Sequence, residues 1–517
     1  MGRWPVVVVL VVCAVAALGA WVWKGRPAPL DAPPVERLPC ASYAPFRGAE
    51  TPFDEGFMVP EARIEEDLKA LSVLTNCVRT YATSNGLDAV PRVAERLGMT
   101  VLQGAWIGRE AESNRIELDR ALALTHAHPK TIRALVVGNE VLLRREQPVE
   151  GLAALLREAK ARSAVPITYA DVWEFWIQAP QLAPLVDIVT VHILPYWEDE
   201  PVAVEIAVDH VAEIRAHVAD AFAGKPLLVG ETGWPTAGRQ REGAEATRHA
   251  QAHFVRALVA RAEAEKWDLN LIEAFDQPWK RALEGTVGGA WGLIDDARQV
   301  KPVLAGAVVE VPAWRSWYAG SVALGLLPLL IGAARRRHMD AATWAVLLAG
   351  GLAAGGALAF FGYHAVEATR GWMEGAVNGV AFVLSGGAAL AVVLALAEPE
   401  ADGGRGLAIA RRLVLAMAAV AVIGMLFDAR YRDFSASLFL APAVGFALLA
   451  LRQGMMDRLP RGPEDRWLAV VVALGAVVAA AREGLHNDDA WAWAAVLVLL
   501  SLPLIVLPGR RSGGPVR

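Results

Sequence analysis

Two glutamates each stand at the end of an apolar run. Glu140 closes "VVGNE", and Glu231 closes "LLVGE" before "TGWPT". Two carboxyl groups that flank a glycosidic bond can cleave it, with one as acid and base and the other as nucleophile or activator of water. Retaining enzymes hold these groups about 5 to 5.5 Å apart and inverting enzymes hold them further apart. Sequence spacing does not measure that gap, so both outcomes stay open.

The neighbours of the two glutamates suggest how the roles divide. Arg79 and Tyr196 follow other apolar runs and could reach Glu231, which would favour its charged form. Glu140 follows Asn139 and an apolar run, and a less solvated carboxyl group holds its proton more strongly. We therefore expect Glu231 to be the nucleophile and Glu140 the acid.

These residues need a scaffold that brings separate runs together. Short apolar or β-branched runs alternate with amphipathic helical patterns, and the eight candidate strands are residues 41–46, 78–83, 100–107, 132–139, 166–172, 186–193, 225–231 and 269–275. Eight strand and helix pairs over about 270 residues predict an α/β fold, a (β/α)8 TIM barrel, with the chemistry at the carboxyl ends of its strands. An open doubly wound sheet is the alternative, although the first run lacks the glycine-rich phosphate loop that often marks such sheets.

The predicted strand ends are rich in acidic and aromatic residues. Aromatic rings can cover the C–H faces of sugars while polar groups bind the hydroxyls. The candidate substrate-binding residues are Arg79, Tyr81, Asn139, Asp171, Trp173, His192, Tyr196, Trp234, Glu273, Trp279 and Lys280. For Glu273 and Lys280 the alternative is a buried ion pair that shapes the rim, and for His192 it is a wall residue. We expect no cofactor and no metal, because the histidines of "HAH" at 126–128 have no partner cluster of suitable spacing.

Five motifs share one resemblance. "GNEVL", "ILPYW", "GETGWPT", "EAFDQPWK" and "GGAWGLID" resemble, in order and spacing, the successive motifs of glycoside hydrolase family 17, a β-1,3-glucanase family. The resemblance covers about residues 40–300 and implies a (β/α)8 barrel. It also implies retention through a covalent glycosyl-enzyme, with Glu140 as acid/base and Glu231 as nucleophile.

The same resemblance implies roles for other residues. Asn139 matches the asparagine that bonds the sugar 2-hydroxyl, Tyr196 the tyrosine that contacts the nucleophile, and Arg79 the arginine beside it. Glu273 and Lys280 match further polar substrate contacts. The apolar second half of the chain resembles the bacterial membrane-bound members of the family, several of which transfer glucan chains.

Apolar segments predict a membrane domain. The run from Pro5 to Trp23 has no charge and is long enough to cross a bilayer, although a cleavable signal peptide is the alternative. Seven further stretches predict an all-α multi-pass bundle: 315–333, 341–361, 375–397, 411–427, 436–451, 467–481 and 490–507. The fifth and sixth are short for a span. The expected organisation is an anchor at 1–24, a proline-rich linker at 25–39, the barrel at 40–313 and a transmembrane domain at 314–517.

Charged loops predict the orientation of this bundle. With a cytoplasmic amino terminus, the inside loops carry thirteen arginines, at 335, 336, 337, 405, 411, 412, 452, 458, 461, 466, 510, 511 and 517. The outside loops after residue 333 carry four, at 370, 430, 432 and 482. The positive-inside rule then places the barrel outside the cytoplasm, on the periplasmic side of a bacterial inner membrane. In that oxidising compartment Cys40 and Cys77, beside the first two strands, could form a disulfide, and two buried thiols are the alternative.

Composition narrows the classes of partner. The net charge is −5, and the region before residue 313 has no run of Lys or Arg, so nucleic acid is not expected. The expected partners are a β-glucan, the lipid bilayer and, as a further possibility, proteins of glucan synthesis or export. We expect a membrane-tethered retaining glycoside hydrolase or transglycosylase acting on β-1,3-glucan. The alternatives are a protein of β-glucan branching or synthesis that forms β-1,6 linkages, a non-catalytic glucan-binding component, and an assembly component or transporter.

Overall fold

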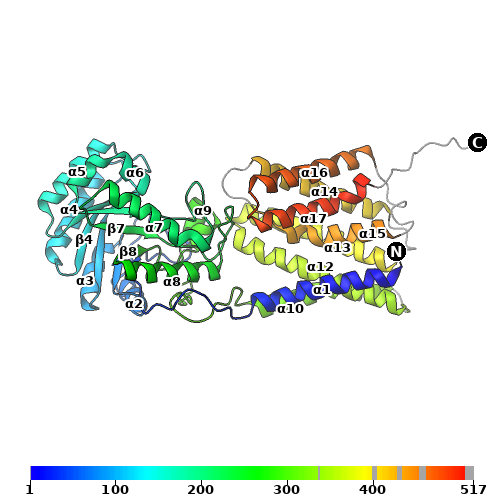
Figure 1. Cartoon of the computed structure of the whole chain (residues 1–517). Helices are drawn as coiled ribbons and strands as arrows, with labels where there is room; N and C mark the ends of the chain where they lie inside the picture. The colour runs from blue at the N-terminus through cyan, green and yellow to red at the C-terminus, as the bar shows by residue number, and fades with distance from the viewer. Residues whose placement is uncertain (1, 336–337, 399–403, 428–432, 453–461, 507–517) are drawn as a thin grey trace, which may run out of the picture. The chain divides into compact units, whose positions relative to one another are not determined.

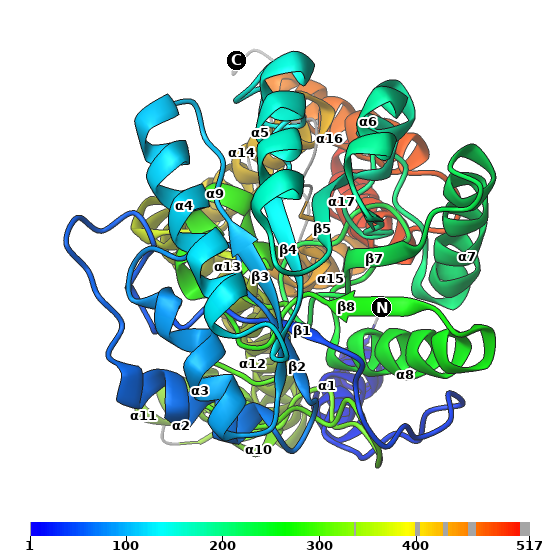
Figure 2. The same cartoon turned by 90° about the vertical axis from the view of Figure 1, so that its left-hand side faces the viewer.

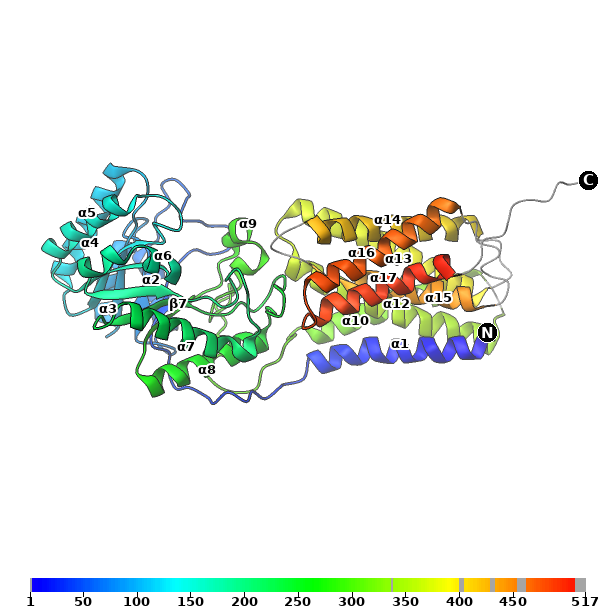
Figure 3. The ribbon, with the colours of Figure 1, turned by 45° about the horizontal axis from the view of Figure 1, so that its top comes forward.

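The computed structural model describes residues 2–335, 338–398, 404–427, 433–452 and 462–506. The chain divides into two compact units. One unit comprises Ala28–Gly238 and Ala244–Val308, and the other draws on Met1–Pro27, Arg239–Gly243 and Val309–Arg517. Figures 1 and 3 show the elements of both units, which we describe separately.

The first unit is a closed barrel of parallel strands in the order β1 to β8. The strands are β1 Ala41–Ser42, β2 Cys77–Arg79, β3 Thr100–Ala105, β4 Ile132–Asn139, β5 Ile167–Val172, β6 Ile188–His192, β7 Leu227–Thr232 and β8 Asp268–Leu271. Each strand coincides with or overlaps a predicted run, so the barrel is confirmed and the open sheet is wrong. β8 ends earlier than predicted because the residues after Leu271 divide their backbone bonds: Ala274 N still donates to Ser42 O of β1, whereas Glu273 N donates to Trp291 O outside the barrel strands.

Helices cover the outside of the barrel, as Figure 2 shows. The longer helices are α2 Glu61–Leu71, α3 Val90–Arg96, α4 Ala111–Ala127, α5 Val149–Arg162, α6 Trp173–Gln178, α7 Val204–Ala221 and α8 Arg248–Glu265. The shorter elements are η1 Leu87–Ala89, η2 Pro180–Leu185, η3 Pro278–Lys280, α9 Arg281–Glu284 and η4 Thr286–Gly289. Leu152 and Leu156 of α5 are fully buried, as expected for the apolar stripe of an amphipathic helix. The strands are buried on both faces, which explains their continuous apolar runs.

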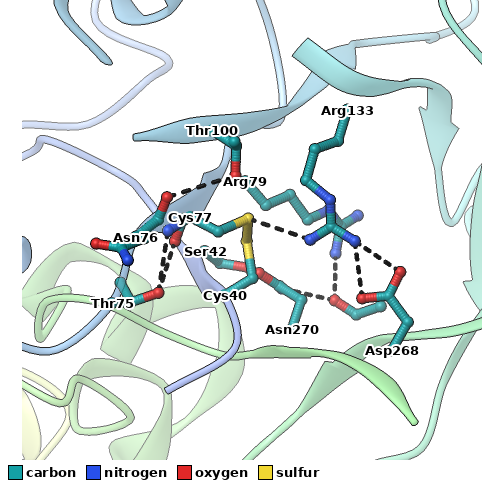
Figure 4. The surroundings of a disulfide bond; sticks show 11 residues. Cys40, Ser42, Thr75, Asn76, Cys77, Arg79, Thr100, Arg133, Asp268 and Asn270 are labelled. Carbon is teal, nitrogen blue, oxygen red and sulfur yellow. Dashed lines mark hydrogen bonds and ion pairs between the residues drawn. A yellow bond between two sulfur atoms is a disulfide. The ribbon is translucent and has the colours of Figure 1, made fainter. Parts of the chain in front are cut away.

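The amino ends of the strands are cross-linked. Cys40, just before β1, forms a disulfide with Cys77 at the start of β2, with the two Cα atoms 4.5 Å apart. Figure 4 shows Arg133 of β4 beside this bond, where it donates to Asp268 at the start of β8 at 2.9 and 3.0 Å. These links join strands at the end of the barrel opposite to the glutamates.

The second unit is made of long apolar helices. They are α1 Arg3–Lys24, α10 Trp314–Gly325, α11 Leu327–Arg335, α12 Ala341–Ala368, α13 Trp372–Ala397, α14 Gly404–Phe427, α15 Ala436–Leu451, α16 Pro463–Arg482 and α17 Asp488–Val506. Every predicted apolar stretch falls on these helices, with the stretch 315–333 divided between α10 and α11. Small residues allow close packing, since a Cβ on Gly351 of α12 would lie 2.1 Å from Gly325 O of α10.

Six helices of the described part are long and apolar enough to cross a membrane, fewer than the eight expected. They are Arg3–Lys24, Trp314–Arg335, Ala341–Ala368, Trp372–Ala397, Gly404–Phe427 and Asp488–Val506. The two others are the helices that contain the short stretches. α15 has 16 residues, and α16 begins with the charged Glu464, Asp465 and Arg466. The arginines at 336, 337, 430, 432, 458, 461, 510, 511 and 517 lie outside the described residues.

The disulfide predicts a measurable contribution to stability. Replacing Cys40 and Cys77 together by Ala opens a loop with a sequence separation of 37 residues and gives the unfolded chain more freedom. We expect a cost of about 2–4 kcal/mol, which corresponds to a loss of roughly 5–10 °C in the unfolding midpoint of the barrel. The midpoint can be followed as loss of protease resistance of the barrel in the full-length chain.

Cys13 provides the matched control for this measurement. It is the free cysteine of the described chain and lies in α1. Cys13→Ala should leave the barrel midpoint unchanged, and a reductant should lower the wild-type midpoint but not that of the double variant. An equal midpoint for the wild type and the double variant under oxidising conditions would show that the bond does not stabilise the barrel.

Candidate active site

The two predicted catalytic glutamates lie together at the carboxyl ends of β4 and β7. A carboxylate oxygen of Glu140, one of Glu231 and a ring nitrogen of His192 all lie within 4.8 Å of one another. This short gap matches the separation of about 5–5.5 Å in retaining glycosidases and not the 6.5–9.5 Å that inverting enzymes need for a water molecule. Glu140 has a left-handed backbone with φ of 51°, a strained conformation that is common at functional sites.

Arg79 of β2 organises one side of this pair. Its Nη1 donates to Glu231 Oε1 and to Gly230 O, both at 2.8 Å. Its Nη2 donates to Asn139 Oδ1 of β4. Arg79 and Glu231 are 1% and 4% exposed, so this ion pair is shielded from water. The positive charge of Arg79 balances the negative charge of Glu231, and the same guanidinium holds the side chain of Asn139 near Glu231.

His192 of β6 lies between the two carboxylates. Its Nδ1 is 3.1 Å from Glu140 Oε1, and its Nε2 is 3.7 Å from Glu231 Oε1. The ring is buried, and Nε2 has no hydrogen-bond partner. The sequence analysis left His192 as a substrate contact or a wall residue, and the structure makes it a bridge between the predicted catalytic groups.

The electrostatics of Glu140 differ from the expectation. Its side chain is 22% exposed against 6% for Glu231, so Glu140 is not the less solvated of the two. Burial of the carboxyl group raises its pKa, but the hydrogen bond and charge of His192, followed by Arg144 and Arg79, outweigh burial and leave the pKa of Glu140 lowered. The expected stabilisation of the proton by burial alone is therefore wrong.

Glu140, His192 and Glu231 form the one cluster among the described residues with donors spaced for a metal ion. Two carboxylates and an imidazole could coordinate a divalent cation. However, the Arg79 guanidinium already holds Glu231 Oε1 at 2.8 Å, so a cation at that oxygen would meet a fixed positive charge. This arrangement suits general acid–base chemistry better than metal binding.

A second polar cluster surrounds the end of β8. Lys280 Nζ lies 2.9 and 3.2 Å from the carboxylate oxygens of Glu273, so the ion-pair alternative describes their contact. Burial raises the pKa of Glu273 to about 7, although Lys280 opposes the shift. Burial lowers the pKa of Lys280, but the charges of Glu273 and Glu284 outweigh it and leave that pKa raised. Burial and the charge of Glu231 raise the pKa of Tyr81, whose buried hydroxyl has no hydrogen-bond partner.

Sequence reasoning missed Glu284 and Arg144. Burial raises the pKa of Glu284; the charge of Lys280 opposes this shift, and the charges of Glu140 and Glu231 add to it, so this carboxyl group belongs to the same electrostatic group. Its place four residues after Lys280 in "KRALE" was the available signal.

Arg144 stands at i+4 from Glu140. Its Nη1 is 3.8 Å from Glu140 Oε2, and its guanidinium stacks on Trp106 with its central carbon 4.2 Å from the ring centroid. Spacing alone could not show which way these side chains turn.

Asp171 has a structural position rather than a place in the cleft. The side chain is fully buried, and its Oδ2 accepts hydrogen bonds from Leu142 N at 3.2 Å and Leu143 N at 3.4 Å. The Tyr169 hydroxyl donates to the same oxygen. Asp171 therefore supports the turn that follows Glu140, instead of making the predicted contact with substrate.

The structure contradicts one of the aromatic predictions, that for Trp234, and the contacts predicted for Tyr196, Trp173 and Trp279 stay predictions. Trp234 is fully buried, its Nε1 donates to Glu245 O at 2.8 Å, and its ring packs 5.5 Å from Phe254, so it cannot cover a sugar. Tyr196 is equally buried and packs edge-on against Trp234, with ring centroids 5.5 Å apart. Trp173 lies half-buried at the start of α6, and Trp279 lies half-buried in η3. Of these four residues, Trp279 is the one that is partly exposed and also lies beside the β8 cluster of Glu273 and Lys280.

Known proteins resemble the part of the chain that forms the barrel. Residues 40–292 match the BtgE/BtgC glycoside hydrolase domain. A glucan 1,3-beta-glucosidase of Schizosaccharomyces pombe is 27% identical over 230 residues, which cover 41% of this chain and 72% of that protein. A glucan endo-1,3-beta-glucosidase of Emericella nidulans is 24% identical over 296 residues, covering 51% of this chain and 45% of that protein. The chain therefore spans less than half the length of this second relative.

A solved structure has a related chain. The glycoside hydrolase family 17 beta-1,3-glucanosyltransferase from Rhizomucor miehei is 26% identical, with a TM-score of 0.45, and the match covers 53% of this chain and 97% of that one.

The raised pKa of Glu273 predicts a pH dependence of stability. Between its ordinary value of 4.5 and about 7, the folded chain holds a proton on Glu273 that the unfolded chain releases. This contribution is complete below pH 4.5 and is lost as the pH rises through about 7. Relative to Glu273→Gln, which cannot ionise, the wild type should lose on the order of 1–3 kcal/mol of unfolding free energy between pH 5 and pH 8. The measurement is the unfolding midpoint of both chains across this range.

Glu213→Gln, on the exposed face of α7, is the control. The difference in unfolding midpoint between Glu213→Gln and the wild type should stay constant through pH 7. A wild-type difference from Glu273→Gln that stays constant from pH 5 to pH 8 would contradict the raised pKa.

Proposed function

We propose that this chain is a membrane-tethered retaining enzyme acting on β-1,3-glucan, since residues 40–292 match the BtgE/BtgC glycoside hydrolase domain and a similar protein is a glucan 1,3-beta-glucosidase. The single observation that carries the proposal is the gap of at most 4.8 Å between carboxylate oxygens of Glu140 and Glu231. A gap of this size leaves no room for a water molecule between nucleophile and sugar, so it favours a covalent intermediate.

In the first step a Glu231 oxygen attacks the anomeric carbon, and the bond from that carbon to the glycosidic oxygen breaks. Glu140 gives its proton to the departing oxygen. Arg79, whose Nη1 lies 2.8 Å from Glu231 Oε1, holds the nucleophile in place before attack and stabilises the negative charge of the carboxylate when it leaves again. Asn139, held by the same arginine, is placed to bond a sugar hydroxyl.

In the second step the Glu140 carboxylate takes a proton from water or from a sugar hydroxyl. The oxygen so activated attacks the anomeric carbon, and the ester bond to Glu231 breaks. His192 supports both states of Glu140, because Nδ1 can accept from the protonated carboxyl group or, as the other tautomer, donate to the carboxylate. The lowered pKa of Glu140 favours the form required in this second step.

Hydrolysis and transfer share this chemistry and differ in the acceptor. The paired carboxylates weigh against a non-catalytic glucan-binding component, since such a component needs no charged pair shielded from water. A role in forming β-1,6 branches would use the same intermediate with a sugar 6-hydroxyl as acceptor.

Replacement of each glutamate tests the assignment. Glu231→Ala should reduce cleavage of laminari-oligosaccharides by three orders of magnitude or more, and azide should then attack the vacated side to give an α-glucosyl azide. Glu140→Ala should slow substrates with poor leaving groups by about 10²–10⁴-fold, while aryl glycosides with good leaving groups still react and azide yields the β-glucosyl product. The products are identified by mass and NMR.

Glu213→Gln again serves as the control and should retain wild-type turnover. Wild-type turnover by Glu231→Ala would contradict the proposed mechanism, in which Glu231 is the nucleophile. A β-azide from Glu231→Ala together with an α-azide from Glu140→Ala would reverse the two roles.

We further propose that 1–24 is an uncleaved anchor, 25–39 a linker, 40–313 the catalytic barrel and 314–517 the membrane domain. The apolar helices and, with α15 and α16 counted as further spans, the uneven distribution of arginines between loops support a multi-pass protein of the bacterial inner membrane with its barrel on the periplasmic side.

Cysteine labelling tests this orientation. In a Cys13→Ala background, Asp31→Cys in the linker should react with a membrane-impermeant maleimide on intact spheroplasts, and Arg405→Cys at the start of α14 should react only after lysis. The chain itself should stay in the membrane fraction after an alkaline carbonate wash. The opposite labelling pattern would place the barrel in the cytoplasm.

A further inference from the structure

Four aromatic rings gather beside the β8 cluster. Trp279 of η3 meets Phe46 and Phe53 of the β1–α2 loop edge-on, with ring centroids 6.2 and 5.8 Å apart. Phe57 packs on Phe46 at 6.0 Å. Phe46 is buried, whereas Phe53 is 67% exposed although it lies against other rings. An exposed aromatic surface beside a group of buried charged residues is typical of a ligand-binding site.

The orientation of Trp279 is fixed. Its Nε1 donates to Gln277 Oε1 at 2.8 Å, and Gln277 Nε2 donates to Ala44 O at 2.9 Å. Gln277 is completely buried, so its amide links the indole of Trp279 to the backbone of the barrel. A ring fixed in this way loses little freedom when a ligand covers its face.

The loop that carries Phe53 is also anchored. Val59 N donates to Asn85 O at 2.9 Å, and Asn85 Nδ2 donates to Pro52 O at 3.3 Å, next to Phe53. Arg63 Nη1 of α2 is 2.6 Å from Glu50 Oε2. The exposed ring therefore stands on a supported loop rather than on a free one.

The position of these rings around the barrel indicates whether they meet the sugar chain on the reducing or the non-reducing side of the bond that is cleaved. In the closed order of eight strands, β8 stands opposite β4, which carries Glu140 at its end. The leaving group must lie at Glu140, because that residue protonates its oxygen. The rest of the sugar chain, on the non-reducing side, then extends toward β8, where Lys280 Nζ lies 5.8 Å from the Trp279 ring centroid and 2.9 Å from Glu273 Oε1.

We propose that Trp279 and Phe53 form a subsite for a glucosyl residue of the β-1,3-glucan chain on the non-reducing side of the residue that reacts. The inference rests on the proposed function and sharpens it. A donor that fills this subsite carries more than one sugar to Glu231, so the enzyme releases or transfers oligosaccharides rather than single glucose units.

The test measures kcat/KM of the full-length protein on 4-nitrophenyl β-laminari-oligosaccharides with one to four glucosyl units. For the wild type, kcat/KM should rise steeply when the substrate becomes long enough for one added glucosyl unit to reach the subsite. Trp279→Ala and Phe53→Ala should each reduce that gain by roughly tenfold and shift the products from oligosaccharides toward glucose. Trp279→Phe and Phe53→Tyr, which keep a ring, should restore most of it.

Ile116→Ala, which removes an exposed apolar side chain from α4, should leave the whole series unchanged. An unchanged gain in both alanine variants overturns the subsite. A loss confined to acceptor dependence, with the donor series intact, places the rings on the leaving-group side and also overturns the proposal. A wild type that cleaves none of these substrates rejects the proposed function itself, a result distinct from both.

Discussion

The buried contact between Arg79 and Glu231 is the constraint on which the site depends. Both side chains are nearly inaccessible to water, and removing water from two charges is costly unless each finds full partners. Arg79 meets that condition by bonding Glu231 Oε1, Gly230 O and Asn139 Oδ1. Loss of either charged partner would leave the other uncompensated, which typically costs about 3–5 kcal/mol.

This contact also requires a closed barrel. Arg79 belongs to β2, Asn139 to β4 and Glu231 to β7, and no two of these strands are neighbours in the sheet. Their ends meet only because the sheet closes on itself. Supports farther out then fix the remaining groups: Asp171 holds the turn after Glu140, and His192 spans the two carboxylates. Rigid strand ends hold the reacting groups, and the β1–α2 loop and η3 supply the aromatic surface that meets the polymer.

The incorrect predictions share one physical cause. Trp234 and Asp171 were chosen because they stand at strand ends beside residues of the correct chemistry. Neighbouring side chains in an extended segment point to opposite faces, so a place at a strand end does not decide whether a side chain faces the catalytic groups. Trp234 turns under the rim onto Tyr196, and Asp171 turns toward backbone amides. The expectation for Glu140 fails for a similar reason, since His192 comes from β6 and the direction of the Arg144 side chain is set by its contact with Trp106 of another segment.

The sequence by itself determined the strand and helix alternation, the apolar segments of the second unit and the identity of the two glutamates. These features are local: apolar runs, helical periodicity and short motifs are legible without knowing what packs against them. Only the tertiary structure decided the gap between the glutamates, the bridging position of His192, the participation of Glu284 and Arg144, and the aromatic surface of Phe53 with Trp279. Such properties are distances and burial between residues far apart in the chain, and only the closure of the barrel brings those residues together.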